Sequence, residues 1–292
     1  MNNTNIHRIL VPVDFSPISK SAIEYSSFLA NLFNAQLFLL HAVEGIHKYP
    51  EDWVKEPGAL MTKELIPHKA TNALKGYVEK LTKDNTIIAN YILTTGHPAH
   101  KIAEAVEENN IDLIVMGTHG ASGFEELFLG SNAHKVVTLS PCPVITIRQG
   151  YHVTGMKTIV LPIDDSLHSR QKVNNVLPLA KKLNATIHLL GLTQSTRKSD
   201  IAKLHLKLQS LEKLIAKAGV KSVMRIVKGE NLAMETMGYA EEIDAEMLAI
   251  MSDHESTMKG MFMGAFAQQI VNHSSLPVLS IRPIKSLYAY SG

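Results

Sequence analysis

The chain has 292 residues, of which 45% are hydrophobic and 19% charged, and its formal net charge is +2 at pH 7. This composition excludes wholesale disorder and fibrous structure, because an ordinary hydrophobic core can form. The small net charge gives no basic field for binding nucleic acid. At roughly 150 residues per domain, the length favours two domains.

The single cysteine, Cys142, excludes an intrachain disulfide framework and fits a reducing compartment. It lies between two prolines at the entrance to a predicted strand, so we expect a small buried hydrophobic residue and not a nucleophile. No segment of signal-peptide type opens the chain, and nowhere do 18 uninterrupted apolar residues occur. The sequence therefore predicts a cytoplasmic protein that does not act on a membrane.

An internal repeat divides the chain. Residues 7–16 read HRILVPVDFS and residues 157–166 read KTIVLPIDDS. The two copies also end alike, with PVITIR at 143–148 and PVLSIR at 277–282. A repeat of this kind indicates two copies of one structural unit. We predict one domain over residues 1–150 and a second over residues 151–292.

The first copy is the longer one, and its extra residues follow Val43. The stretch over residues 44–60 contains two prolines, two glycines and the only tryptophan of the chain. These residues favour a loop or a lid over a regular element.

Short apolar runs rich in β-forming residues alternate with helical patterns in both copies, which is typical of βαβ units and a parallel sheet. Apolar spacings of three and four residues predict helices over 18–32 and 201–218. Ser16 is placed to cap the first of these helices. The fold class is thus α/β, with two tandem doubly wound five-stranded parallel-sheet domains. The predicted strands are 8–13, 36–42, 86–93, 112–116 and 143–148 in the first copy, and 157–163, 185–191, 221–227, 246–251 and 278–282 in the second.

Two segments of the first copy converge where ligands bind in such sheets, beyond the carboxyl ends of the strands. Asp14 follows the first strand, and the glycine-rich stretch from Gly117 to Asn132 follows the fourth. Glycines permit close backbone approach and positive φ, and a helix that begins near Ser131 offers N–H groups to an anion. The pattern therefore predicts a phosphate site. For Asp14, both ligand binding and simple capping of the following helix remain open.

The spacing of the glycines excludes three common sites. The chain has no G-x-x-x-x-G-K-[ST] loop, and no G-x-G-x-x-G follows its first strand. The sequence GASG at 120–123 is not a G-x-S-x-G nucleophile elbow either.

The sequence contains LVPVD at 10–14, GHPAHKI at 96–102, PCPVITIR at 141–148, and the pattern G-x2-G-x9-G-[ST] at Gly117, Gly120, Gly130 and Ser131. These motifs resemble those of the ATP-binding branch of the universal stress protein family, whose fold is adenine nucleotide alpha hydrolase-like. Both copies resemble members of this family, so the resemblance covers nearly the whole chain. It implies a tandem protein whose last strands, 143–148 and 278–282, pair antiparallel to form an intrachain pseudo-dimer.

The resemblance implies that ATP, or ADP or AMP, binds to the first copy, with Mg²⁺ as an optional companion of the phosphates. Asp14 would lie near the base and ribose, the segment from His41 to Val43 would border the adenine, and the loop would surround the phosphates. His119 lies in the loop, where it either contacts a phosphate or is simply exposed. The expected nucleotide-binding residues are Pro12, Val13, Asp14, His41, Val43, Met116, Gly117, His119, Gly120, Gly130, Ser131 and Asn132; no catalytic or metal-ligating residue is expected.

The second copy departs from this pattern. Aligned on the strands, Gly117 becomes Ser252, Gly120 becomes Glu255, and the loop is one residue shorter. A carboxylate in this loop would repel phosphate, so we expect a degenerate crevice or one with a different ligand. The side chains of Met258, Met261 and Met263 are expected to fill it.

The sequence favours a regulatory or stress-response protein in which ATP binding changes a surface for an unidentified protein partner. It shows no general base, activated nucleophile or carboxylate pair aimed at the phosphates, so hydrolysis is expected to be slow. The alternatives are a slow ATPase or a nucleotidyl- or phosphoryl-transfer enzyme that uses the same crevice with His119, and a scaffold that binds no nucleotide. Assembly into homo-oligomers is left open.

Overall fold

The computed structural model describes residues 6–45, 49, 62–83, 87–118, 130–153, 155–164, 168–252, 254–257 and 260–283. Its contacts divide the chain into two compact units. One unit contains most of the first repeat, up to residue 142, together with residues 147–152. The other contains residues 143–146 and the chain from residue 153 onward.

The first repeat forms a sheet in the strand order β3-β2-β1-β4-β5. Strand β1 pairs in parallel with β2 and β4, and β2 pairs in parallel with β3. The winding reverses between β1 and β4, which is where a doubly wound sheet opens a crevice. The elements are β1 (Arg8–Pro12), α1 (Pro17–Phe33), β2 (Gln36–Val43), α3 (Thr62–Thr82), β3 (Ala89–Thr95), α4 (Pro98–Glu108), β4 (Leu113–Gly117), α5 (Ser131–Leu139) and β5 (Val144–Ile147).

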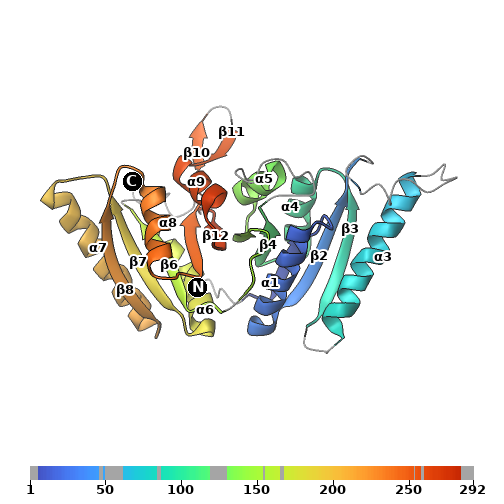
Figure 1. Cartoon of the computed structure of the whole chain (residues 1–292), viewed down its shortest axis with the longest axis horizontal. Coiled ribbons are helices and arrows are strands. Elements are labelled where there is room, and N and C mark those ends of the chain that lie inside the picture. Colours follow the sequence, from blue (N-terminus) through green and yellow to red (C-terminus); the bar gives the residue numbers. More distant parts are fainter. Residues whose placement is uncertain are drawn as a thin grey trace. The chain divides into compact units, whose positions relative to one another are not determined.

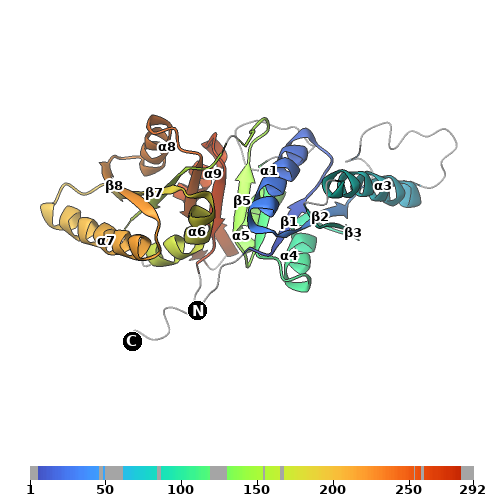
Figure 2. The same ribbon diagram turned by 90° about the horizontal axis from the view of Figure 1, so that it is seen from below.

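Helices cover both faces of this sheet, as the continuous apolar strands require. Helix α1 packs on β1 and β4, whereas α4 packs on β2 and against α5. Figure 2 shows α1 and α4 on opposite sides of the strands. Residues Leu113–Met116 of β4 are buried, which confirms that this strand is covered on both faces.

The second repeat repeats this plan in the order β12-β9-β6-β7-β8. Strand β6 pairs in parallel with β7 and β9, β7 with β8, and β9 with β12. The elements, all but β9 labelled in Figure 1, are β6 (Thr158–Ile163), α6 (Ser169–Leu183), β7 (Thr186–Thr193), α7 (Lys198–Lys217), β8 (Lys221–Lys228), α8 (Leu232–Glu242), β9 (Met247–Met251), β10 (His254–Thr257), β11 (Gly260–Met263), α9 (Ala265–His273) and β12 (Val278–Ile281).

Residues of β5 belong to the same compact unit as β12 and pair with it antiparallel. Thr146 lies opposite Val278, and Val144 lies opposite Ser280. This is the pairing of last strands that the family resemblance implied.

The ten predicted strands are all present, most within one or two residues of their predicted ends. The third strand begins at Ala89 and not at residue 86. A short antiparallel hairpin, β10–β11, was not predicted. Among the described residues, none of the helices combines the length and apolar content that a membrane span requires.

The first predicted helix begins as its sequence indicated. Ser16 is the N-cap of α1, where its hydroxyl accepts a hydrogen bond from the Ser19 N–H, and Pro17 occupies the first turn. At the other end Asn34 adopts a left-handed conformation with φ 54°, as the short polar side chain of Asn allows. The prediction of the cap at Ser16 is confirmed.

Cys142 is partly exposed as a residue, so it is less buried than predicted. Burial of its thiol nevertheless raises the pKa of Cys142 to about 11, although the Ser140 hydroxyl beside the sulfur opposes the shift. The reactive thiolate is therefore scarce near neutral pH. At pH 8 we expect a thiol reagent such as DTNB to label the native protein roughly a hundredfold more slowly than the urea-unfolded chain. Equal rates in the two states would show that the thiol is not shielded.

Candidate functional site

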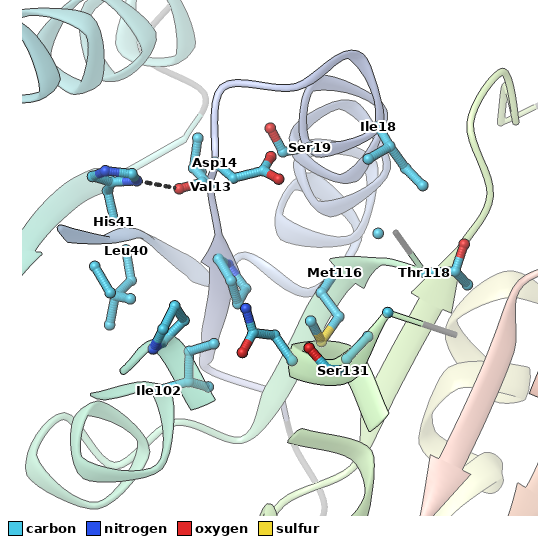
Figure 3. A pocket seen from close by; sticks show the side chains of 17 residues that line it. Val13, Asp14, Ile18, Ser19, Leu40, His41, Ile102, Met116, Thr118 and Ser131 are labelled. Atoms are coloured by element: carbon cyan, nitrogen blue, oxygen red, sulfur yellow. Dashed lines mark hydrogen bonds between the residues drawn. The ribbon is translucent and has the colours of Figure 1, made fainter. Parts of the chain in front are cut away.

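A pocket of about 160 Å³ opens at the carboxyl ends of β1 and β4, where the winding of the first sheet reverses. Four further elements, α1, β2, α4 and α5, contribute to its wall, which combines buried apolar side chains with polar groups, and Figure 3 shows their arrangement. The lining residues are Pro12, Val13, Asp14, Ile18, Ser19, Leu40, His41, Ala42, Pro98, Ile102, Met116, Gly117, Thr118, Gly130, Ser131, Asn132 and Ala133.

Asp14 lines the pocket and also organises the turn into α1. Its carboxylate accepts hydrogen bonds from the backbone N–H and the hydroxyl of Ser16, which in turn caps the helix. Between them, Phe15 has φ 65°, a left-handed conformation that is costly for a bulky residue. Such backbone strain tends to persist at functional sites. Ser16, and not Asp14, is thus the N-cap of α1, while Asp14 supports that cap and lines the pocket.

His41 forms part of the pocket wall, and both of its ring nitrogens contact groups of the protein. Nδ1 lies 2.6 Å from the Val13 carbonyl oxygen, which can only accept, so Nδ1 carries the hydrogen. Nε2 then accepts from the Tyr49 hydroxyl at 2.9 Å. Burial lowers the pKa of His41, while the Val13 carbonyl and the charge of Asp14 partly oppose this shift. A neutral His41 tethers the end of β1 to β2 and is not positioned as a general base.

Neither of the two described glycines of the loop has a positive φ, which was one of the two reasons predicted for glycine there. A Cβ atom on Gly117 would lie 2.7 Å from Cγ1 of Ile18, so Gly117 permits the close packing of α1 on β4. Gly130 is the N-cap of α5, with φ −55° and ψ 146°, and among the described residues no side chain caps this helix. The N–H groups of the first turn of α5 therefore lie at the pocket without a side-chain cap.

Backbone hydrogen bonds fix both ends of the glycine-rich loop. Thr118 N–H donates to the Ile147 carbonyl at 2.9 Å, and Gly130 N–H donates to the Thr118 carbonyl at 2.8 Å. The start of α5 is thereby held close to the end of β4. Residues 119–129 between these ends, including His119 and Gly120, lie outside the described residues.

Nine of the twelve expected residues meet at the pocket. Val43 does not line it; its carbonyl accepts the Gly96 N–H at the end of β2 instead. Pro98 and Ile102 were not expected there, although they belong to the GHPAHKI motif. The nine are Pro12, Val13, Asp14, His41, Met116, Gly117, Gly130, Ser131 and Asn132, and the lining residues not expected are Ile18, Ser19, Leu40, Ala42, Pro98, Ile102, Thr118 and Ala133.

Hydrogen bonding shows that the sequence alignment of the second loop was wrong by one residue. Ser252 N–H donates to the Ile281 carbonyl at 2.9 Å, as Thr118 does to Ile147. Ser252 therefore corresponds to Thr118, and Met251 corresponds to Gly117. Because Gly264 is the N-cap of α9 as Gly130 is of α5, the two loops have equal length. The predicted one-residue deletion is absent, and Glu255 no longer aligns with Gly120.

Two lysines occupy the strand end of the second repeat that corresponds to the pocket. Lys172 is 4% exposed, and its ammonium group donates to the carbonyl of Pro162, the counterpart of Pro12. Lys207, from α7, donates to the carbonyl of Asp164 at 2.8 Å. Sequence reasoning missed both residues, because the apolar periodicity of a helix does not show where a long cationic side chain reaches.

The methionines expected to fill the second crevice are only partly described. Met263 is buried, with 5% of its surface exposed. Met258 and the side chain of Met261 lie outside the described residues. The expectation that these side chains fill the crevice therefore stays a prediction.

Comparison with known proteins bears on both repeats. A sequence model of the Universal stress protein family matches residues 5–148 and again residues 155–282. Universal stress protein YxiE of Bacillus subtilis is 35% identical over 152 residues, which cover 49% of this chain and 99% of the relative. Universal stress protein Slr1230 of Synechocystis is 24% identical over 292 residues, 94% of this chain and 99% of the relative.

The fold is similar to that of a solved tandem-length structure. The crystal structure of a universal stress protein from Archaeoglobus fulgidus matches with a TM-score of 0.75 and 20% identity, covering 97% of this chain and 100% of that chain. At this identity the likeness concerns the fold. The two matches to the family model carry the assignment, and the chain belongs to the universal stress protein family, with two copies of its domain in tandem.

Proposed function

We propose that the first repeat binds an adenine nucleotide, ATP, ADP or AMP, and that the chain is a regulatory stress-response protein whose partner surface depends on this ligand. The observation that carries the proposal is the convergence of the β1 end, the β4 end and the start of α5 on one pocket. These are the segments that the family resemblance relates to the base, ribose and phosphates.

The pocket fits the parts of a nucleotide. Leu40, Ile102 and Met116 are buried apolar side chains suited to the face of a base. The carboxylate of Asp14 is an acceptor suited to ribose hydroxyls. At the start of α5, the N–H groups and the exposed Ser131 hydroxyl are donors suited to phosphate oxygens, in the field of the helix dipole.

Mg²⁺ belongs to the proposal as an ion carried by the phosphates. Among the described residues, no group of three or more His, Cys, Asp or Glu side chains could hold a metal ion. Mg²⁺ commonly keeps several waters and binds through substrate phosphates, so it needs few protein ligands.

The second repeat is proposed to take no adenine nucleotide. The ammonium groups of Lys172 and Lys207 already bond to the carbonyls at the end of β6. The N-terminus of α8, the helix that corresponds to α4, offers fewer free N–H groups as well. Its N-cap residue Asn231 accepts hydrogen bonds from the N–H groups of Ala233 and Met234.

Isothermal titration of ATP, ADP and AMP into the purified protein tests the proposal, with GTP as the control for the base. We expect saturable binding of the adenine nucleotides at one site per chain and much weaker binding of GTP. A stoichiometry of two per chain would contradict the closed second repeat. The absence of any adenine-nucleotide binding would refute the central proposal.

A further inference from the structure

A small basic cluster, defined here as His97, His100 and Lys135, lies beside the pocket. The Lys135 ammonium nitrogen is 3.1 Å from Nε2 of His97. The rings of His97 and His100 are 5.2 Å apart in an edge-to-face arrangement. Helices α4 and α5, which carry these residues, pack against each other, and Figure 1 shows them next to each other.

The contact between Lys135 and His97 fixes which group donates the hydrogen bond and which accepts it. An ammonium group only donates, so Nε2 of His97 accepts and the hydrogen of the neutral ring is on Nδ1. Nδ1 of His97 is buried and has no hydrogen-bond partner among the described residues. Lys135 likewise has no carboxylate within ion-pair distance in the described part of the chain, whereas the nearby Lys101 pairs with Glu104 at 2.6 Å. Among the described residues, the charge of Lys135 is thus contacted by an imidazole and by no carboxylate.

The cluster adjoins the end of the pocket that carries the helix N-terminus. Lys135 follows Ser131 by four residues, so the two side chains share one face of α5 with Cβ atoms roughly 5–6 Å apart. Ser131 lines the pocket, and so does Pro98, the neighbour of His97 in the chain. A flexible four-carbon stem lets the ammonium group reach an anion bound at Ser131.

Charge differs between the two ends of the site. Asp14 supplies a carboxylate at the β1 end of the pocket, whereas α5 supplies N–H groups at the other end. The positive charge of Lys135 is not part of the lining and lies one helical turn beyond Ser131 on α5. A nucleotide with more phosphates would extend further past Ser131 toward Lys135. Each added phosphate oxygen near this charge gains a charge-assisted hydrogen bond that a monophosphate does not reach.

We propose that Lys135, held by His97, binds the distal phosphate of the nucleotide, so that the site selects adenosine di- and triphosphates over the monophosphate. This inference rests on the proposed function and extends it to the length of the phosphate chain. Lys135 is then a specificity-determining residue, and His97 is a positioning residue.

The test compares the affinities of ATP and AMP in wild type, Lys135→Met and the control Lys101→Met, measured by titration calorimetry at one ionic strength. Lys135→Met is expected to weaken ATP binding about tenfold or more, the value of one hydrogen bond to a charged group, and to leave AMP binding within about twofold. Lys101→Met should change neither affinity, because its partner is Glu104. Lys135→Arg, which keeps the charge, should retain part of the preference for ATP.

Three results would overturn parts of this scheme in different ways. Equal weakening of ATP and AMP in Lys135→Met would mean that Lys135 supports the structure of the site and does not contact the distal phosphate. Unchanged ATP binding would remove Lys135 from the site. If wild type binds neither nucleotide, the proposed function itself fails, and the three variants are not needed to show it.

Discussion

Gly130→Asp is expected to reduce the affinity for ATP at least about a hundredfold without destabilising the protein. The new carboxylate would stand at the N-cap of α5, at the proposed phosphate position, where like charges repel by several kcal/mol. Asp is also a preferred N-cap residue, and φ −55° with ψ 146° suits it. The side chain would therefore satisfy the same N–H groups that we assign to the phosphate.

Gly264→Asp is the matched control, because Gly264 is the N-cap of α9 with nearly the same backbone angles, φ −60° and ψ 151°. Both helices have nine residues and neither has a side-chain cap. We expect both variants to unfold at the wild-type temperature or slightly above it, and only Gly130→Asp to lose nucleotide binding in calorimetry. Normal ATP binding by a folded Gly130→Asp protein would show that the phosphates lie elsewhere.

Gly117→Ala is expected to lower the free energy of unfolding by about 1–3 kcal/mol, the usual cost of overpacking a core. The added methyl group would lie 2.7 Å from Cγ1 and 3.0 Å from Cγ2 of Ile18, which is itself 4% exposed and lines the pocket. A displaced Ile18 would also change the pocket wall, so we expect weaker nucleotide binding. Urea unfolding and calorimetry measure the two effects.

A double-mutant cycle with Ile18→Ala identifies the cause. In that background the clashing atoms are gone, and Gly117 has no positive φ, so Gly117→Ala should cost almost nothing or stabilise slightly through the unfolded state. The same cost in both backgrounds would mean that the backbone, and not Ile18, requires glycine at residue 117.

The sequence predicted the helices and strands well because their positions depend on local periodicity and on the repeat. Continuous apolar runs placed β4 and β9, and the cap at Ser16 placed the start of α1. The convergence of Asp14 and the start of α5 followed from a general property of doubly wound sheets and not from any single residue.

Other features of the site depend on contacts between residues far apart in the chain, and a single sequence does not show these contacts. The role of Gly117 is set by Ile18, about a hundred residues earlier in the chain. The protonation of His41 is set by the Val13 carbonyl and by burial. The one-residue error in the second loop is a different case, because the offset of 134 residues between PVITIR and PVLSIR already contains the register that the hydrogen bond from Ser252 to Ile281 shows.

The two loops, Gly117–Gly130 and Met251–Gly264, are equal in length, and equivalent hydrogen bonds, from Thr118 to Ile147 and from Ser252 to Ile281, hold their starts. Their divergence therefore required substitutions only, with no insertion or deletion to shift the register of the sheet. A duplicated domain of this kind can exchange the ligand chemistry of one copy while both copies keep the same scaffold. The crevice of the second repeat can thus change by substitution while the first repeat, in the proposed function, continues to bind the nucleotide.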